Sequence, residues 1–316
     1  KDRMRLLGNI HKGEPWVRNV SKPYTAKEGL EGNHIALWQS HGRYYKSDKD
    51  DWYWQRPRLF CTTEDLFSQT FVVPFIIPML ENAGAVVFTP RERDYQPHEV
   101  IVDNDHPNRN GTYIESFRRK QKNIRWQTTE RPGFAQYKEI YESCDSPFTD
   151  GSARCVPTVS SAKDEGLAQW MPDIPAEGRY AVYVTYQSYE NSVPDATYTV
   201  YHKGGMTELK VNQQIGGGTW VYLGTFEFEK GEHDFGMVSL SNYSRHRGII
   251  TADAVRFGGG MGNIIPEGHH GSVRPSGLPR WAEGAKYSVQ WYGFPYRLHT
   301  EPFGENDYNN DINSRS

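Results

Sequence analysis

The chain lacks the features that would assign it at once to a nucleic-acid-binding or membrane-spanning class. Its 36 basic and 39 acidic side chains give a formal net charge of -3 over 316 residues, so no basic excess indicates a nucleic-acid partner. No uninterrupted apolar run reaches the roughly eighteen residues that a membrane-spanning helix needs. An initiating Met and a signal peptide are also missing, as we expect of a mature product or an excised piece.

Cysteine is scarce, with three residues in the chain. Cys144 and Cys155 flank a loop that contains Pro and Gly, and in an oxidising compartment they would pair. Such a disulfide would stabilise the fold by about 2–3 kcal/mol through loop closure. Two buried free thiols are the competing interpretation, and the sequence leaves both open.

Aromatic residues, by contrast, are abundant. They make up 14% of the chain, with 9 Trp and 20 Tyr. Rings at this density are typical of sheet-rich domains, because aromatic residues favour strands, and of surfaces that stack on sugar rings. The length is ample for two domains.

Residues 33–94 are predicted to form one β-α-β unit. The segment NHIALWQ has the pattern of a short buried strand and is followed by Ser40-His41-Gly42. Open α/β sheets place their chemistry just beyond the carboxyl ends of strands, so His41 is a candidate site residue. A second β-branched strand, AVVFTP, follows Gly84 and ends at Pro90.

A helix is predicted between these two strands. Thr62 and Thr63 are N-cap candidates before Glu64, whose charge suits a helix N-terminus. Apolar residues over 66–80 nearly encircle the helix, so we expect it to pack against a sheet over a wide face. Two prolines inside this run each remove a backbone donor and should kink or break the helix.

These motifs follow one another in a recognisable order: Ser40-His41-Gly42, Glu64-Asp65, Ala83-Gly84-Ala85 and Pro90-Arg91-Glu92-Arg93-Asp94. The series resembles the opening of zinc-dependent N-acetylmuramoyl-L-alanine amidases. The resemblance implies that His41 and Glu64 are two of three protein zinc ligands. An imidazole and a carboxylate also suit zinc on chemical grounds, and a zinc hydrolase keeps its fourth position for water.

The end of the chain resembles a return to the same domain. Asp311-Ile312-Asn313-Ser314-Arg315 is similar to the start of the amidase helix that precedes the third zinc-ligand histidine. The resemblance therefore places the third ligand and the general base beyond Ser316. His299 is an alternative third ligand within the chain, although Pro295 and Pro302 bracket it as a loop.

A different pattern begins near Ala168. Strand-like segments recur between turns at even spacing, namely RYAVYVTYQ, ATYTVYHKG, GTWVYLGTFEFE, HDFGMVSLSN and IITADAVRFGG. In the first of them, Tyr180, Val182, Val184 and Tyr186 alternate with Ala181, Tyr183 and Thr185. Each strand should therefore bury one face, which predicts an antiparallel β-sandwich with a jelly-roll-like topology.

Specific motifs in this part of the chain carry a second resemblance, over roughly 135–262. They are Trp170-Met171-Pro172-Asp173, Tyr180-Ala181-Val182-Tyr183, Asp195-Ala196-Thr197-Tyr198, Gly216-Gly217-Gly218-Thr219-Trp220, Leu240-Ser241-Asn242 and Ala252-Asp253-Ala254-Val255-Arg256-Phe257-Gly258-Gly259. This series resembles the golvesin-type domain, which is also found attached to xanthan lyases. The resemblance implies a carbohydrate-binding or accessory role.

Three further candidates lie in or beside this domain. Trp220 and Tyr222 alternate with apolar residues, so they either stack on a sugar or pack inside the protein. Asp253 lies between alanines in a strand and needs partners, which are backbone donors, Arg256 or a structural cation such as calcium. The acidic segment 103–106 before a proline has the composition of an ordinary turn rather than of a metal site.

The sequence thus predicts an α/β plus all-β protein in four parts. These are an N-terminal arm (1–32), the first part of an amidase-like α/β domain (33–134), an inserted golvesin-like β-sandwich (135–262), and a linker with a return to the α/β domain (263–316). The leading hypothesis is a cell-envelope zinc hydrolase that acts on peptidoglycan and binds glycan, located in the periplasm, on the outer surface or outside the cell. A non-catalytic carbohydrate-binding protein and a protein associated with polysaccharide lyases are the alternatives.

Overall fold

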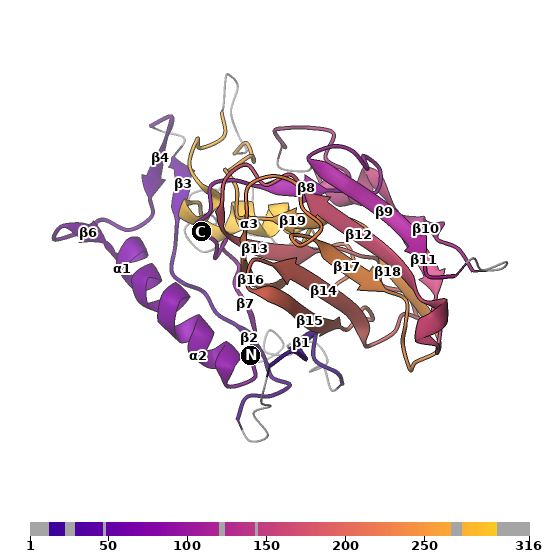
Figure 1. Cartoon of the computed structure of the whole chain (residues 1–316). Coiled ribbons are helices and arrows are strands. Elements are labelled where there is room, and N and C mark those ends of the chain that lie inside the picture. Colours follow the sequence, from indigo (N-terminus) through magenta and orange to yellow (C-terminus); the bar gives the residue numbers. More distant parts are fainter. Residues whose placement is uncertain are drawn as a thin grey trace, which may run out of the picture.

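The computed structural model describes residues 13–22, 29–46, 49–119, 124–142, 145–266 and 274–295. A large antiparallel β-sandwich fills one side of the molecule, and a smaller α/β unit lies against it (Figure 1). The C-terminal helix α3 (Ala285–Trp291) packs where the two parts meet.

The sandwich is built from three antiparallel sheets. The largest is six-stranded, in the order β1 (Val17–Asn19), β15 (Gly205–Val211), β14 (Ala196–His202), β17 (Val238–Ser241), β12 (Gly166–Pro172) and β9 (Gly111–Phe117). A four-stranded sheet has the order β16 (Val221–Phe228), β13 (Gly178–Val184), β19 (Val255–Phe257) and β8 (Val100–Val102). The third sheet contains β10 (Gln127–Gly133), β11 (Gly151–Pro157) and β18 (Ile249–Ala252).

The strand β13 differs from the expectation that each strand buries one face. Tyr180 and Val182 face the main sandwich core, whereas Ala181 and Tyr183 belong to a second, aromatic core. Both sets are buried, because the α/β unit and α3 cover the outer face of this sheet. The prediction of a single buried face is therefore wrong for β13.

The α/β unit has the predicted β-α-β connection. The strand β2 (His34–Ala36) pairs in parallel with β7 (Val86–Phe88), and α1 (Glu64–Phe71) and α2 (Ile77–Asn82) connect them. Thr63 is the N-cap of α1, and its side chain accepts a hydrogen bond from the amide of Leu66. A π-helical stretch, Val72–Ile76, joins the two helices where Pro74 removes a donor, as the predicted break requires.

Short elements complete the chain. Two hairpins project between β2 and α1, made of β3 (Arg43–Lys46) with β4 (Asp51–Trp54) and of β5 (Arg58–Leu59) with β6 (Thr62–Thr63). Single 3₁₀ turns occur at Pro147–Thr149, Ala162–Asp164 and Arg280–Ala282. None of the helices in the described ranges is long and apolar enough to cross a bilayer.

The sheets cross the domain boundaries expected from the sequence. Strands β8, β9 and β10, which fall within 33–134, hydrogen-bond to sandwich strands β19, β12 and β11. The strand β1 of the expected N-terminal arm pairs with β15. These pairings join residues far apart in sequence, so local composition does not reveal them.

Candidate functional site

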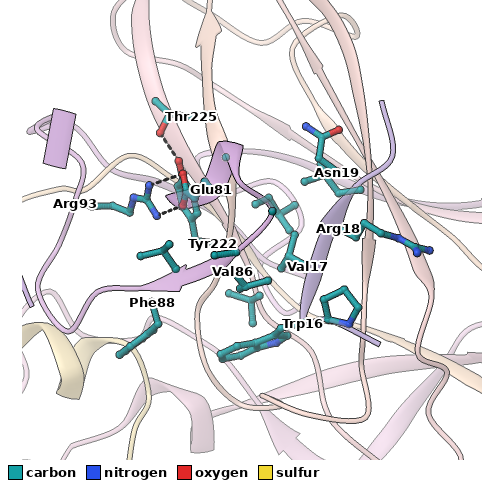
Figure 2. A pocket seen from close by; sticks show the side chains of 18 of the residues that line it. Trp16, Val17, Arg18, Asn19, Glu81, Val86, Phe88, Arg93, Tyr222 and Thr225 are labelled. Carbon is teal, nitrogen blue, oxygen red and sulfur yellow. Dashed lines mark hydrogen bonds and ion pairs between the residues drawn. The ribbon is translucent and has the colours of Figure 1, made fainter. Parts of the chain in front are cut away.

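A cavity of ≈ 390 Å³ opens where the sandwich, the α/β unit and the N-terminal segment meet (Figure 2). Strand β16 contributes Tyr222, α2 and β7 contribute Glu81 and Phe88, and the segment around β1 contributes Trp16. The lining combines aromatic rings with a few charged groups, which is typical of small-molecule sites.

An ion pair fixes one wall of the cavity. Both guanidinium nitrogens Nη1 and Nη2 of Arg93 bind the carboxylate of Glu81, at 2.7 and 3.0 Å. The guanidinium also lies over the ring of Tyr222, 4.0 Å from its centroid, and Thr225 binds the Tyr222 hydroxyl at 2.9 Å. Bidentate pairing leaves little rotational freedom, so this wall is preorganised.

Trp16 closes another part of the cavity. Its indole Nε1 donates to the hydroxyl of Tyr186 at 2.8 Å, and its ring covers Gly216. A Cβ on Gly216 would lie 2.1 Å from that ring, so only glycine permits this close approach. Trp16 is therefore anchored to the sandwich although it lies in the predicted arm.

The two sequence-predicted sugar-stacking residues both border the cavity but differ in exposure. Trp220 is 3% exposed and packs with Phe134 and Phe148 in the aromatic core, so it is not a surface platform. Tyr222 is half-buried and lines the cavity, with Arg93 over one face of its ring. Between them, Val221 faces the main sandwich core, as their alternation predicted.

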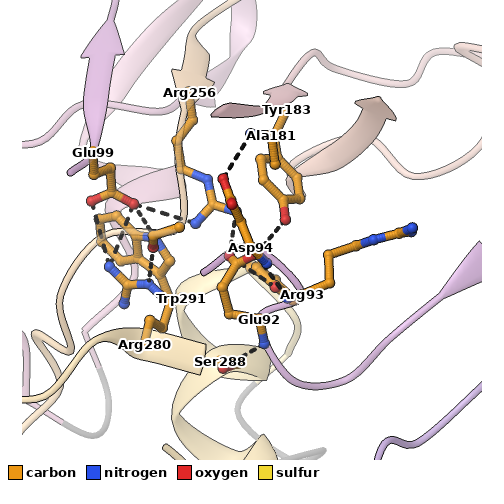
Figure 3. Close-up of polar contacts among 12 residues, drawn as sticks. Glu92, Arg93, Asp94, Glu99, Ala181, Tyr183, Arg256, Arg280, Ser288 and Trp291 are labelled. Carbon is orange, nitrogen blue, oxygen red and sulfur yellow. Dashed lines mark hydrogen bonds and ion pairs between the residues drawn. The ribbon is translucent and has the colours of Figure 1, made fainter. Parts of the chain in front are cut away.

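Glu92 is the centre of a buried polar layer behind the cavity (Figure 3). Its carboxylate accepts hydrogen bonds from the hydroxyl of Tyr183 at 2.5 Å and from Arg256 Nη2 at 2.9 Å. Tyr292 adds a third contact at 3.2 Å. The neighbouring Asp94 accepts from the amide of Ala181 at 2.7 Å, and burial together with Glu92 raises the pKa of Asp94 to about 6.

Glu99 forms the second anionic centre of this layer. It binds Arg256 Nη1 at 3.3 Å, Arg280 Nη2 at 3.4 Å and the indole of Trp291 at 3.1 Å. Arg280 continues the network to Asn263 at 2.8 Å. Because these groups come from the sandwich, from 280–291 and from the chain after β7, the layer ties all three together.

The predicted site residue His41 follows β2 in a short loop. Its Nδ1 lies 3.8 Å from Oδ1 of Asp65, and both atoms are buried without a hydrogen-bond partner. Burial lowers the pKa of His41 and raises that of Asp65. Glu64 is exposed at the first turn of α1, close enough that its charge favours protonated His41.

Arg91 holds the His41 loop in place. It donates to the carbonyls of Ser40 at 3.0 Å and of His41, and on the other side to those of Trp281 at 2.7 Å and Glu283 at 2.9 Å. Burial lowers the pKa of Arg91 to about 10, so it stays charged at neutral pH. Sequence reasoning found His41 but missed both Asp65 and Arg91 as its neighbours.

The remaining candidates do not assemble a metal centre in the structure. Within the described ranges, no group of three or more His, Cys, Asp or Glu side chains is arranged to hold a metal ion. His299 and Cys144 lie outside the described residues, so the third zinc ligand and the pairing with half-buried Cys155 stay predictions.

Asp253 accepts hydrogen bonds from a backbone amide. Its carboxylate accepts from the amide of Phe134 at 3.0 Å, while Arg256 pairs elsewhere. Asp105 and Asp103 lie in the predicted turn, where the Asp105 amide donates to the Asp103 carboxylate at 3.2 Å. These contacts do not test whether the sandwich binds calcium, so calcium binding stays a prediction.

Comparison with known proteins supports the resemblance to the golvesin-type domain. Residues 151–259 match the family described as the Golvesin C-terminal domain, which confirms a golvesin-type domain within the stretch 135–262 where the sequence predicted one. A stretch of 100 residues is 35% identical to xanthan lyase from Bacillus sp. (strain GL1). That stretch is 31% of this chain but 10% of the enzyme, so the chain spans a small part of this relative.

Solved structures overlap about half of this chain, each with a TM-score below 0.5. A xanthan lyase from Paenibacillus overlaps 51% of this chain and 13% of its own, with 23% identity and a TM-score of 0.38. The C-terminal family 22 carbohydrate-binding module of Clostridium thermocellum Xyn10B overlaps 49% of this chain and 90% of its own, with 11% identity and a TM-score of 0.24. The sequence similarity is therefore to the Golvesin C-terminal domain family over residues 151–259 and to part of a xanthan lyase over 100 residues.

Proposed function

We propose that this chain is a glycan-binding protein whose cavity between β16, β7 and β1 receives part of a polysaccharide. The observation that carries the proposal is the preorganised aromatic lining of this cavity. Sugar rings present apolar faces and polar edges, which match Tyr222 and Phe88 beside the Arg93–Glu81 pair. Its volume of ≈ 390 Å³ suits one or two sugar residues.

The sequence relationship supports the class of ligand. The relative with 35% identity is named xanthan lyase, so a polysaccharide is the first ligand to test. Peptidoglycan is the second, because the amidase-like motifs of 33–94 point to the cell envelope. Both ligands place the protein in the periplasm, on the outer surface or outside the cell.

Binding should be measured by affinity electrophoresis and calorimetry with xanthan and with soluble peptidoglycan fragments. Phe88→Leu removes a ring from the cavity wall, and we expect it to weaken binding about tenfold, since one aromatic–sugar contact contributes about 1–2 kcal/mol. Phe235→Leu is the matched control, because Phe235 is 48% exposed and does not line the cavity. Equal affinity of wild type and Phe88→Leu would exclude the cavity as the site.

The second candidate function is the zinc hydrolase. The orphaned Nδ1 of His41 favours it, because a buried neutral imidazole with a free lone pair suits a metal ligand. His41 would hold the zinc with Glu64 or with Asp65, whose Oδ1 is also unpartnered. Bound zinc would supply Lewis-acid chemistry for amide hydrolysis, and in this proposal the third ligand would come from outside the described residues.

Metal analysis separates this function from simple glycan binding. We expect zinc retained by the wild type to fall in His41→Ala, and the two single variants Glu64→Ala and Asp65→Asn identify the partner carboxylate. Zinc content unchanged in all three variants would overturn the assignment. Release of muropeptides from peptidoglycan by a longer form of the protein would establish the reaction.

A further inference from the structure

The helical segment 64–82 leaves an apolar face in solvent. Phe67, Phe71, Phe75 and Met79 are 52, 48, 59 and 69% exposed, whereas Ile77 on the opposite side is fully buried. These four residues, called the exposed row below, are spaced four apart and therefore lie along one side of the helix. The rings of Phe67 and Phe71 touch, with centroids 5.0 Å apart.

The exposed row overturns one expectation from the sequence. Apolar residues nearly encircle this helix, which predicted burial over a wide face. In the structure the side with Ile77 packs against Ala85 and Val87 at β7, with Leu30, Ile35 and Leu37 around them, while the exposed row stays in solvent. Figure 1 shows α1 and α2 at the outer edge of the molecule, with the sandwich on their inner side.

No charged residue interrupts the segment 66–80. A contiguous apolar surface without charge is uncommon on soluble proteins and marks a place where another surface binds. The segment also lacks the Lys and Arg residues that attach an amphipathic helix to an anionic membrane. A protein surface of the same apolar character is the better match.

We propose that a second copy of this chain covers the exposed row, with the two helices antiparallel. A two-fold axis near residue 73 places Phe71 opposite Phe75 of the second copy, and Phe67 opposite Met79. Sulfur–aromatic and ring–ring contacts are both favourable. The same operation brings exposed Glu64 opposite Asn82, which is uncharged. It also relates Asp65 to Glu81, but Asp65 is fully buried and Glu81 is paired with Arg93, so these two carboxylates do not meet across the row. The row is thus complementary to itself, as a two-fold interface requires.

The exposed apolar area of the row sets how tightly two copies should associate. Half-exposed aromatic side chains offer roughly 100 Å² each, so the row with Ile76 contributes roughly 500 Å² per copy. Two copies would bury roughly 1,000 Å², at the lower limit for a specific interface. We therefore expect a dimer that dissociates in the micromolar range rather than an obligate one.

Sedimentation equilibrium of the intact chain from about 1 to 100 μM tests the proposal. We expect the average mass to rise from the monomer value of 36.3 kDa toward twice that value. Phe75→Lys places a charge in the contact and should weaken association at least tenfold. Phe235→Lys, at an exposed aromatic position elsewhere, should leave association unchanged. Circular dichroism checks that both variants fold.

Mixing variants tests the register. Phe75→Lys and Phe71→Glu should each be monomeric alone, yet form a heterodimer together, because positions 75 and 71 face one another across the axis. A monomer at every concentration would overturn the proposal, as would a dimer that survives Phe75→Lys. Monomeric protein that sediments with neutral phosphatidylcholine vesicles, but not when Phe75→Lys is used, would assign the row to a membrane instead.

Discussion

Replacing Arg256 by methionine tests whether the buried polar layer holds the two parts of the molecule together. Arg256 is fully buried and pairs with Glu92 at 2.9 Å and Glu99 at 3.3 Å. Its guanidinium also lies 3.8 Å from the centroid of the Tyr183 ring. Burial lowers the pKa of Arg256, but Glu92 and the groups around it raise it overall, so the side chain is charged.

The expected loss of unfolding free energy in Arg256→Met depends on which partners Glu92 and Glu99 keep. Methionine fills much of the same volume but leaves Glu92 buried with only the hydroxyls of Tyr183 and Tyr292 and backbone amides as donors. Glu99 keeps Arg280. Removing one partner of a buried ion pair costs about 3–5 kcal/mol, and for a chain of this size that lowers Tm by about 5–15 °C.

Urea unfolding of wild type, Arg256→Met, Glu92→Gln and the double variant measures the coupling. We expect Glu92→Gln to cost at least about 1.5 kcal/mol less in the Arg256→Met background, because the carboxylate has already lost its partner. Arg179→Met is the control, since Arg179 is exposed in β13 and its replacement should change the free energy of unfolding by less than about 0.5 kcal/mol. If Arg256→Met lowers the free energy of unfolding by less than about 1 kcal/mol, the buried ion pair does not hold the two parts of the molecule together.

Three further changes test other parts of the structure. Burial raises the pKa of Asp103 to about 7, so ionisation destabilises the fold as pH rises from about 4 to 7. In urea unfolding, Asp103→Asn should therefore gain about 1–3 kcal/mol over wild type at pH 8 and much less at pH 4.5, where only the onset of this destabilisation is present. An equal gain at both pH values would contradict this. Gly42→Ala places a Cβ 2.3 Å from the carbonyl oxygen of Glu283. We expect the free energy of unfolding to fall by about 1–3 kcal/mol, measured by thermal unfolding. An unchanged Tm would show that the backbone moves apart here without cost. Tyr183→Phe removes a donor to Glu92 and should cost about 1–3 kcal/mol of unfolding free energy in the same assay. This cost should rise in the Arg256→Met background, where Glu92 depends more on its tyrosine donors.

Local features of the α/β unit were predictable from the sequence. The N-cap Thr63, the helix start at Glu64 and the strand at 86–88 depend on neighbouring residues, and the structure confirms them. The break in the helix was predictable for the same reason, because a proline lacks a backbone donor wherever it lies. The golvesin-type strands were predictable from their alternation.

Non-local pairing was not predictable in this way. Nothing near Val100–Val102 indicates that this strand pairs with β19, about 155 residues later. The motif Arg91-Glu92-Arg93-Asp94 follows a predicted strand and carries four charges, yet all four side chains are largely buried and each contacts a different element. Burial of charge depends on partners elsewhere in the chain, which composition does not show.

That motif also explains why the cavity has a fixed shape. A two-stranded parallel sheet is not stable alone, so β2 and β7 depend on the sandwich and α3 for their position. Arg93 shapes the cavity through Glu81 and Tyr222, while the adjacent Glu92 anchors the same segment to Arg256 in the sandwich. A glycan bound between the two parts must therefore stabilise both together, by about 2.7 kcal/mol at a hundredfold excess over its Kd. Loss of this stabilisation in Arg256→Met, with the fold retained, would show that the buried layer positions the walls of the cavity as well as holding the fold.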